Sequence, residues 1–71
     1  MNEIEQKRIK QIGENLRRIQ QKYFTPTSKI AQSTGVHIST LTLIIKDKLE
    51  YGVSEEKLEA LEKFIDERRF W

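Results

Sequence analysis

The sequence predicts an all-α protein, a compact bundle of four to five helices that forms a single domain over residues 1–71. The first observation behind this prediction is that apolar residues recur every three or four positions, the period of an amphipathic helix. The second is that Pro26, Gly35 and Gly52 stand between the patterned stretches, where the chain must turn. The third is the length, since a chain of 71 residues can bury one core.

The longest apolar pattern predicts a first helix over residues 3–22. Asn2 is a suitable N-cap, and Glu3 and Glu5 suit the positive end of the helix dipole. Gly13 in the middle of a helix costs up to about 1 kcal/mol relative to Ala, so we expect another helix to cross closely there. The predicted apolar stripe consists of Ile9, Ile12, Leu16, Ile19 and Tyr23.

The central stretch, residues 27–46, predicts two short helices joined by a tight turn. Gly35 stands where the chain reverses, because glycine tolerates the left-handed conformation that ends a helix. Just before this stretch, we expect Thr25 to cap the helix, Pro26 to take its first position and Phe24 to pack into the core. The residues expected to face inward are Ile30, Ala31, Val36, Leu41 and Ile44.

A loop and a last helix complete the predicted fold. Leu49 and Val53 are expected to turn inward from the loop, and Ser54 is a suitable N-cap for the helix after it. This last helix closes the core through a second apolar stripe. The stripe consists of Leu58, Leu61, Phe64 and Ile65.

The composition argues against several classes of protein. The chain has no cysteine and one histidine, so we expect no disulfide framework and no metal site. No apolar run approaches the ~20 residues that cross a bilayer, and the N-terminal segment is too charged for a signal peptide. No residues predict a catalytic constellation, so we expect neither an enzyme, nor a cofactor, nor a small-molecule ligand. A soluble, cytoplasmic protein without membrane association is the expectation.

The net charge of +2 hides an asymmetry along the chain. Residues 1–48 hold nine Lys and Arg against four Asp and Glu, a balance of +5, whereas residues 49–71 hold four against seven, a balance of −3. A basic body and an acidic last helix favour a protein that turns one face toward a polyanion. The alternative is an ordinary solvated helix surface, which also carries many charges.

The central stretch resembles a known DNA-binding motif. Its order of small and apolar residues resembles the helix-turn-helix of the Cro/C1 (lambda repressor-like) group of bacterial and phage proteins. Residues 12–19, IGENLRRI, resemble the first helix of that group, and the likeness covers roughly residues 12–65. The residues that carry the motif are Ala31, Gly35, Val36, Leu41 and Ile44.

The sequence departs from the group's pattern at three places. Thr34 occupies a position that is usually apolar, and Thr27 stands where many members carry a Gln that touches phosphate. Many members also place a Glu near the end of the second motif helix, where it pairs with an Arg of the first helix. Here that neighbourhood, residues 44–47, reads IIKD.

The resemblance implies a central helix-turn-helix whose second helix enters the major groove of DNA. At about 100° per residue, the outward face of that helix lies opposite Leu41 and Ile44. Hydroxyls and Lys can contact base edges there, and Leu can pack on a thymine methyl group. The expected base-reading residues are Ser39, Thr42, Leu43 and Lys46. The expected phosphate contacts are Thr27, Ser28, Lys29, His37, Lys48 and Arg17, although a plain turn or a solvated helix face also accounts for several of them.

Two functions remain open. The first is a sequence-specific, repressor-like transcriptional regulator of a phage or bacterium, which binds double-stranded DNA as a homodimer in the nucleoid or in an infected cell. The second is a protein-interaction module on the same fold, such as an antirepressor or an inhibitor of a larger regulator, favoured by Ile38, Leu43 and Ile45. Three alternatives are open for Phe70 and Trp71: they extend a dimer interface, fold back on the core, or have no packing role.

Overall fold

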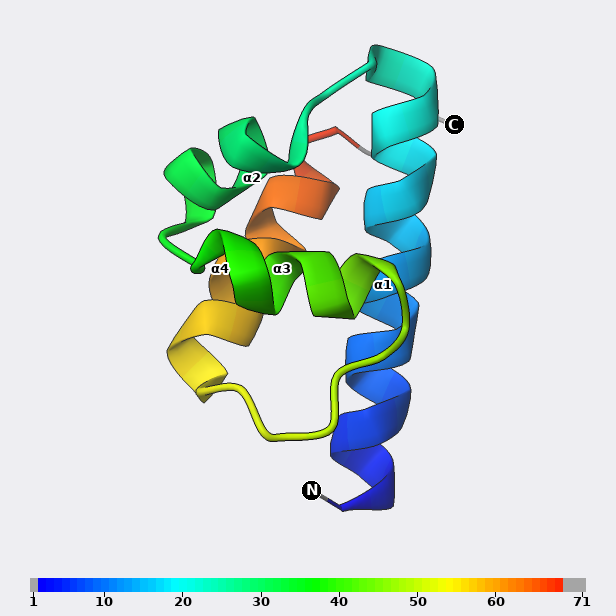
Figure 1. Cartoon of the computed structure of the whole chain (residues 1–71), viewed down its shortest axis with the longest axis vertical. Helices are drawn as coiled ribbons and strands as arrows, with labels where there is room; N and C mark the ends of the chain where they lie inside the picture. The colour runs from blue at the N-terminus through cyan, green and yellow to red at the C-terminus, as the bar shows by residue number, and fades with distance from the viewer. Residues whose placement is uncertain (1, 69–71) are drawn as a thin grey trace.

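The computed structural model of the chain describes residues 2–68. In that range the chain folds into four helices and no strand, which confirms the all-α prediction at the lower of the two expected helix numbers. The helices are α1 (Glu3–Tyr23), α2 (Thr27–Thr34), α3 (Ile38–Ile45) and α4 (Glu55–Asp66). Figure 1 shows α1 along the long axis of the molecule, with the three shorter helices gathered on one side of it. Both α1 and α2 contact α3 and α4.

One core joins the four helices of the described range, and the predicted apolar stripes supply it. Leu16, Leu41 and Leu61 are each 0% exposed, so the phase predicted for α1, α3 and α4 is confirmed. Tyr23 is the exception on the first stripe, because it lies on the last turn of α1, beyond the reach of the core, and is 42% exposed. The buried apolar residues are Ile9, Ile12, Leu16, Ile19, Ile30, Val36, Leu41, Ile44, Val53, Leu58, Leu61, Phe64 and Ile65.

The start and the middle of α1 agree with the prediction. The Oδ1 atom of Asn2 accepts the backbone N–H of Glu5 at 2.8 Å, which caps the helix. Gly13 is buried, and a Cβ built on it would lie 2.5 Å from the carbonyl oxygen of Ile44 in α3. The close helix crossing expected from this glycine is therefore present, and α3 is the helix that crosses.

The junction between α1 and α2 differs from the prediction at Phe24, at Pro26 and at Thr25, which is not the N-cap of α2. Phe24 is 88% exposed rather than packed in the core, because it ends α1 in the left-handed conformation, with φ 53°, and its side chain leaves the core side. Pro26, with extended backbone angles, is the N-cap of α2 and not its first helical residue. Gln20 connects the two helices instead, since its Nε2 donates to Oγ1 of Thr27 at 3.1 Å.

The turn between α2 and α3 shows how the hydroxyl of Thr34 is accommodated at a position that is usually apolar in the Cro/C1 pattern. Gly35 has φ 76° and donates its N–H to the carbonyl of Ala31 at 2.9 Å, which ends α2 as predicted. Oγ1 of Thr34 donates to the carbonyl of Ile30 at 2.8 Å and accepts the N–H of Val36 at 3.3 Å. The Thr34 hydroxyl is therefore satisfied locally, and Val36 is left to fill the core at 1% exposure.

The end of α3 is fixed by two backbone hydrogen bonds that reach back into the helix. Asp47 donates to the carbonyl of Ile44 at 3.1 Å, and Lys48 donates to the carbonyl of Leu43 at 2.9 Å. Asp47 takes the left-handed conformation that this ending requires, with φ 58°. The chain therefore leaves α3 in a defined direction, with lysines on both sides of Asp47.

The last helix is tied to the first by an arginine. Ser54 is the N-cap of α4, as predicted, but its side chain makes no capping hydrogen bond. Arg8 of α1 donates to Glu55 at 2.6 Å and to Glu62 at 2.5 Å, so two acidic residues of α4 share one guanidinium. These hydrogen bonds, first with Glu62 and then with Glu55, raise the pKa of Arg8 above its ordinary value. Two acidic side chains of the last helix, Glu55 and Glu62, are therefore paired with a cation of the same chain.

Candidate nucleic-acid interface

The four residues predicted to read bases form one stripe on α3. They stand at positions i, i+3, i+4 and i+7 of the helix and its C-cap, so they are neighbours on one side. Ser39 and Lys46 are exposed, and Thr42 and Leu43 are half-buried. Leu41 and Ile44, at 0% and 1% exposure, occupy the opposite side of the same helix. We name the stripe of Ser39, Thr42, Leu43 and Lys46 the reading face.

His37 has a local task that was not evident from the sequence. It is the N-cap of α3, and its Nδ1 accepts the backbone N–H of Ser39 at 3.2 Å. The same Nδ1 lies 2.7 Å from Oγ of Ser39. His37 is therefore a capping residue rather than a plain turn residue, and its exposed ring still faces solvent beside the reading face.

The hydroxyl groups of the reading face are both engaged with the protein. Oγ1 of Thr42 donates to the carbonyl of Ile38, one turn earlier, at 2.8 Å. Oγ of Ser39 contacts Nδ1 of His37. A third hydroxyl on α3, that of Thr40, is 3.2 Å from the phenol oxygen of Tyr51 in the loop after the helix. These contacts hold the side chains of α3 in defined orientations.

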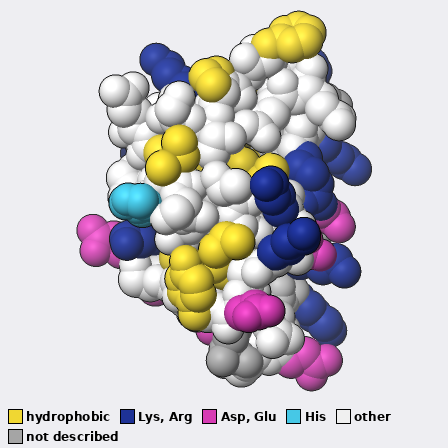
Figure 2. Space-filling view, in the orientation of Figure 1, with side chains coloured by type: hydrophobic (Ala, Val, Ile, Leu, Met, Phe, Trp, Pro, Cys, Tyr) yellow, Lys and Arg dark blue, Asp and Glu magenta, His cyan; other side chains and the backbone are white. Residues whose placement is uncertain are grey.

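Basic side chains gather at the C-terminal end of α3. Lys46 and Lys48 are exposed there, and Figure 2 shows Lys and Arg side chains clustered beside this end of the helix, next to α1. Arg17 of α1 belongs to this end too, because its guanidinium donates to the carbonyl of Ile45. That hydrogen bond caps α3 and accounts for the half-buried position of Arg17, for which the sequence indicated either a phosphate contact or a solvated helix face.

The other end of the reading face borders an open groove. The groove is lined by residues of α2, of the turn and of α4 and by the first residue of α3, and these include Ser28, His37 and Ile38. It brings two of the predicted phosphate contacts, Ser28 and His37, to one place. Lys57 of α4 also lines it, and this residue was not predicted because it lies 20 positions beyond the histidine and on another helix.

The first turn of α2 lies next to that groove. Thr27, Ser28 and Lys29 form this turn, and no side chain caps the helix N-terminus. Lys29 and Ser28 are exposed, whereas Thr27 is half-buried and accepts a hydrogen bond from Gln20. The backbone N–H groups at such a helix start attract anions.

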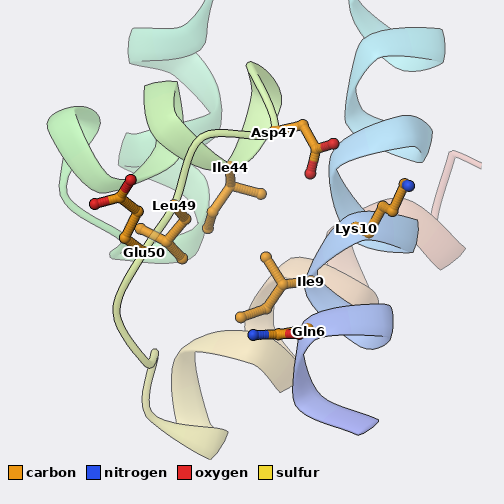
Figure 3. Close-up of a pocket in the computed structure, with 7 residues that line it drawn as sticks. All are labelled: Gln6, Ile9, Lys10, Ile44, Asp47, Leu49 and Glu50. Carbon is orange, nitrogen blue, oxygen red and sulfur yellow. The ribbon is translucent and has the colours of Figure 1, made fainter. Parts of the chain in front are cut away.

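A separate pocket of about 440 Å³ lies between α1 and the loop after α3 (Figure 3). Ile9, Ile44 and Leu49 point toward one another at its floor, with polar side chains around its rim. Ile9 and Ile44 are already 5% and 1% exposed, so a ligand would cover little further apolar surface. We interpret it as a packing groove between α1 and the loop.

The described part of the chain contains no candidate for a membrane segment or a metal centre. None of its helices is both long and apolar enough to cross a membrane. No group of three His, Cys, Asp or Glu among residues 2–68 is placed to hold a metal ion. The expected dimer contacts Phe70 and Trp71 lie outside the described residues.

Comparisons with known proteins found no matching family model, no matching curated protein and no matching solved structure. The resemblance to the Cro/C1 group is therefore one of sequence alone, carried by residues 12–19 and by the central stretch.

Proposed function

We propose that this chain binds double-stranded DNA, with the reading face of α3 in the major groove. The observation that carries the proposal is that α3 buries Leu41 and Ile44 and turns hydroxyls, a leucine and a lysine to solvent on the opposite side. The major groove is about 12 Å wide and admits one α-helix. An eight-residue helix such as α3 is about 12 Å long, enough to contact three or four base pairs.

The charges around the reading face support the same function. Lys46 and Lys48 lie at the C-terminal end of α3. Lys57 lines the open groove of the protein beside His37, at the N-terminal end of α3. A helix in the major groove is flanked by two phosphate backbones, so cations at both ends suit the contacts that fix the register of a protein on DNA. The uncapped start of α2, with Ser28 and Lys29, offers a further phosphate contact.

The way α3 is held also favours DNA reading. α1 contacts α3 through Gly13 and Arg17, four residues apart on the same face of α1. A reading helix needs a fixed position, because base contacts depend on hydrogen-bond distances of about 3 Å. The proposed biological role is that of a small repressor-like regulator, which resembles the Cro/C1 group in its central motif.

Such a regulator would act as a homodimer. A two-fold axis would place the second α3 about 34 Å away, one turn of B-DNA further on. The binding site is then an imperfect palindrome. The test is a selection of bound duplexes from a random pool, which should enrich such a palindrome; a pool that remains random would contradict sequence-specific binding.

A second function, docking of another protein, is favoured by the apolar surface beside α3. Ile38 is 45% exposed and Tyr51 is 51% exposed, and Figure 2 shows exposed apolar side chains over the loop that succeeds α3. Ile45 does not add to this surface, since it packs against the core. Leu43→Ala distinguishes the two functions, because it would abolish a protein complex but only alter the sequence preference of a DNA-binding protein.

A further inference from the structure

The hydroxyl groups of the reading face have a fixed hydrogen-bonding polarity: each donates its proton to a group of the protein and is left to accept from outside. Oγ1 of Thr42 lies 2.8 Å from the carbonyl oxygen of Ile38. A carbonyl oxygen can only accept, so the Thr42 hydroxyl must be the donor in this hydrogen bond. Its proton is therefore used within the helix, and the lone pairs of Oγ1 remain for a partner outside.

The hydroxyl of Ser39 has the same polarity. Nδ1 of His37 accepts the backbone N–H of Ser39, so this nitrogen carries no proton and the ring holds its proton on Nε2. Oγ of Ser39 lies 2.7 Å from the same Nδ1; in this tautomer the hydroxyl is the donor and shares the Nδ1 lone pair with the backbone N–H. Ser39 and Thr42 are three residues apart and adjacent on the reading face, and both present oxygen lone pairs outward.

From this polarity we infer that Ser39 and Thr42 read the exocyclic amino groups of DNA bases. This inference depends on the proposed function. In the major groove only the N6 group of adenine and the N4 group of cytosine donate hydrogen bonds, whereas N7 and O6 of guanine, N7 of adenine and O4 of thymine accept them. Two hydroxyls that act as acceptors therefore match amino groups and do not match the purine N7 atoms.

The neighbours of the two hydroxyls complete the readout. Leu43 stands four residues after Ser39, next to it on the helix surface, and offers an apolar contact for the methyl group of thymine, the partner of adenine in an A·T pair. Lys46, one turn further on, is a donor only and suits O6 and N7 of guanine or a phosphate. The N-terminal half of the reading face thus selects hydrogen-bond donors on the DNA bases, and its C-terminal end selects hydrogen-bond acceptors on the DNA.

The test uses base analogues in the duplex that the wild type enriches from a random pool. Purine in place of adenine, or 2-pyrimidinone in place of cytosine, removes one amino group. 7-Deazaadenine in place of adenine, or 7-deazaguanine opposite the cytosine, removes the N7 of that base pair and keeps the amino group. Loss of the amino group at one or two positions should lower affinity about three- to tenfold, the effect of one hydrogen bond. The 7-deaza analogues at the same positions should leave affinity unchanged.

The variants Ser39→Ala and Thr42→Val assign each effect to one hydroxyl. Thr42→Val keeps the shape of the side chain. In this variant, removal of the amino group that Thr42 reads should cause no further loss of affinity for the duplex. Loss of affinity with the 7-deaza analogues, or no response to either kind of analogue, would overturn the inference and leave DNA binding intact. If the wild type enriches no duplex at all, the proposed function fails, and the inference fails with it.

Discussion

The carbonyl oxygen of Ile44 lies against Gly13, so closely that a Cβ on the glycine would approach it to 2.5 Å. One turn further along α1, Arg17 donates to the carbonyl of Ile45. Two consecutive carbonyl groups at the C-terminal end of α3 therefore contact two residues on one face of α1. This contact sets the distance and the rotation of α3 relative to α1, and with them the direction of the reading face.

Gly13→Ala should destabilise the protein by about 1–3 kcal/mol, because a backbone carbonyl cannot move away as a flexible side chain can. The gain in helix propensity, up to about 1 kcal/mol, offsets only part of this cost. Unfolding by urea, monitored by circular dichroism, measures the difference. A variant at least as stable as the wild type would show that α1 and α3 do not cross at this glycine.

Leu41→Ala should cost about 2–5 kcal/mol, since Leu41 is 0% exposed and its loss leaves a cavity in the core. Leu43→Ala, the same truncation two residues later, provides the control because Leu43 is only half-buried on the reading face. Thermal melts of the two variants should differ clearly. Equal losses would mean that the phase assigned to α3 is wrong.

Gly35→Ala should cost about 1–2 kcal/mol through the backbone alone. The φ of 76° disfavours a Cβ, yet nothing lies within 4 Å of where that atom would be. Gly35→Asn is the matched control, because asparagine tolerates the left-handed region better and should lose less. If both variants unfold at the same denaturant concentration as the wild type, the turn does not require a positive φ.

Arg8→Gln should lower the melting temperature at low salt, because it removes the contacts of α1 with Glu55 and Glu62. The guanidinium remains partly accessible to solvent, so salt screens its attraction to the two carboxylates. The difference from the wild type should therefore shrink between about 0.05 and 1 M salt. A difference that does not change with salt would point to lost packing of the Arg8 side chain instead.

The sequence predicted the core well because burial depends on hydrophobic periodicity, a local property. Leu16, Leu41 and Leu61 all lie where their three- and four-residue spacing places them. Phe24 was mispredicted because its left-handed backbone directs the ring outward, and hydrophobicity carries no information on that angle. Asparagine or glycine at this position would have indicated the turn.

The parts of the candidate site that were missed depend on contacts between distant residues. Lys57 reaches the groove beside His37 only because α4 packs against α2. The hydrogen bond from Arg17 to the Ile45 carbonyl joins residues 28 positions apart. Every residue has a backbone carbonyl, so the sequence does not indicate which one accepts. The spacing of the reading face, in contrast, was visible because it repeats within one helix.

The most direct test of the reading face is a titration of labelled duplex DNA across a salt series with a matched pair of lysine variants. Lys46→Gln removes a charge from the reading face, and Lys63→Gln removes one from α4, which lies behind α3 in Figure 1. Wild-type affinity should fall steeply between about 50 and 200 mM salt, because phosphate contacts release counterions. Lys46→Gln should weaken binding and, where Lys46 meets a phosphate, lower the salt slope by about 1, whereas Lys63→Gln should match the wild type. Affinity that is flat in salt, or equal losses in the two variants, would contradict the proposal that α3 binds DNA.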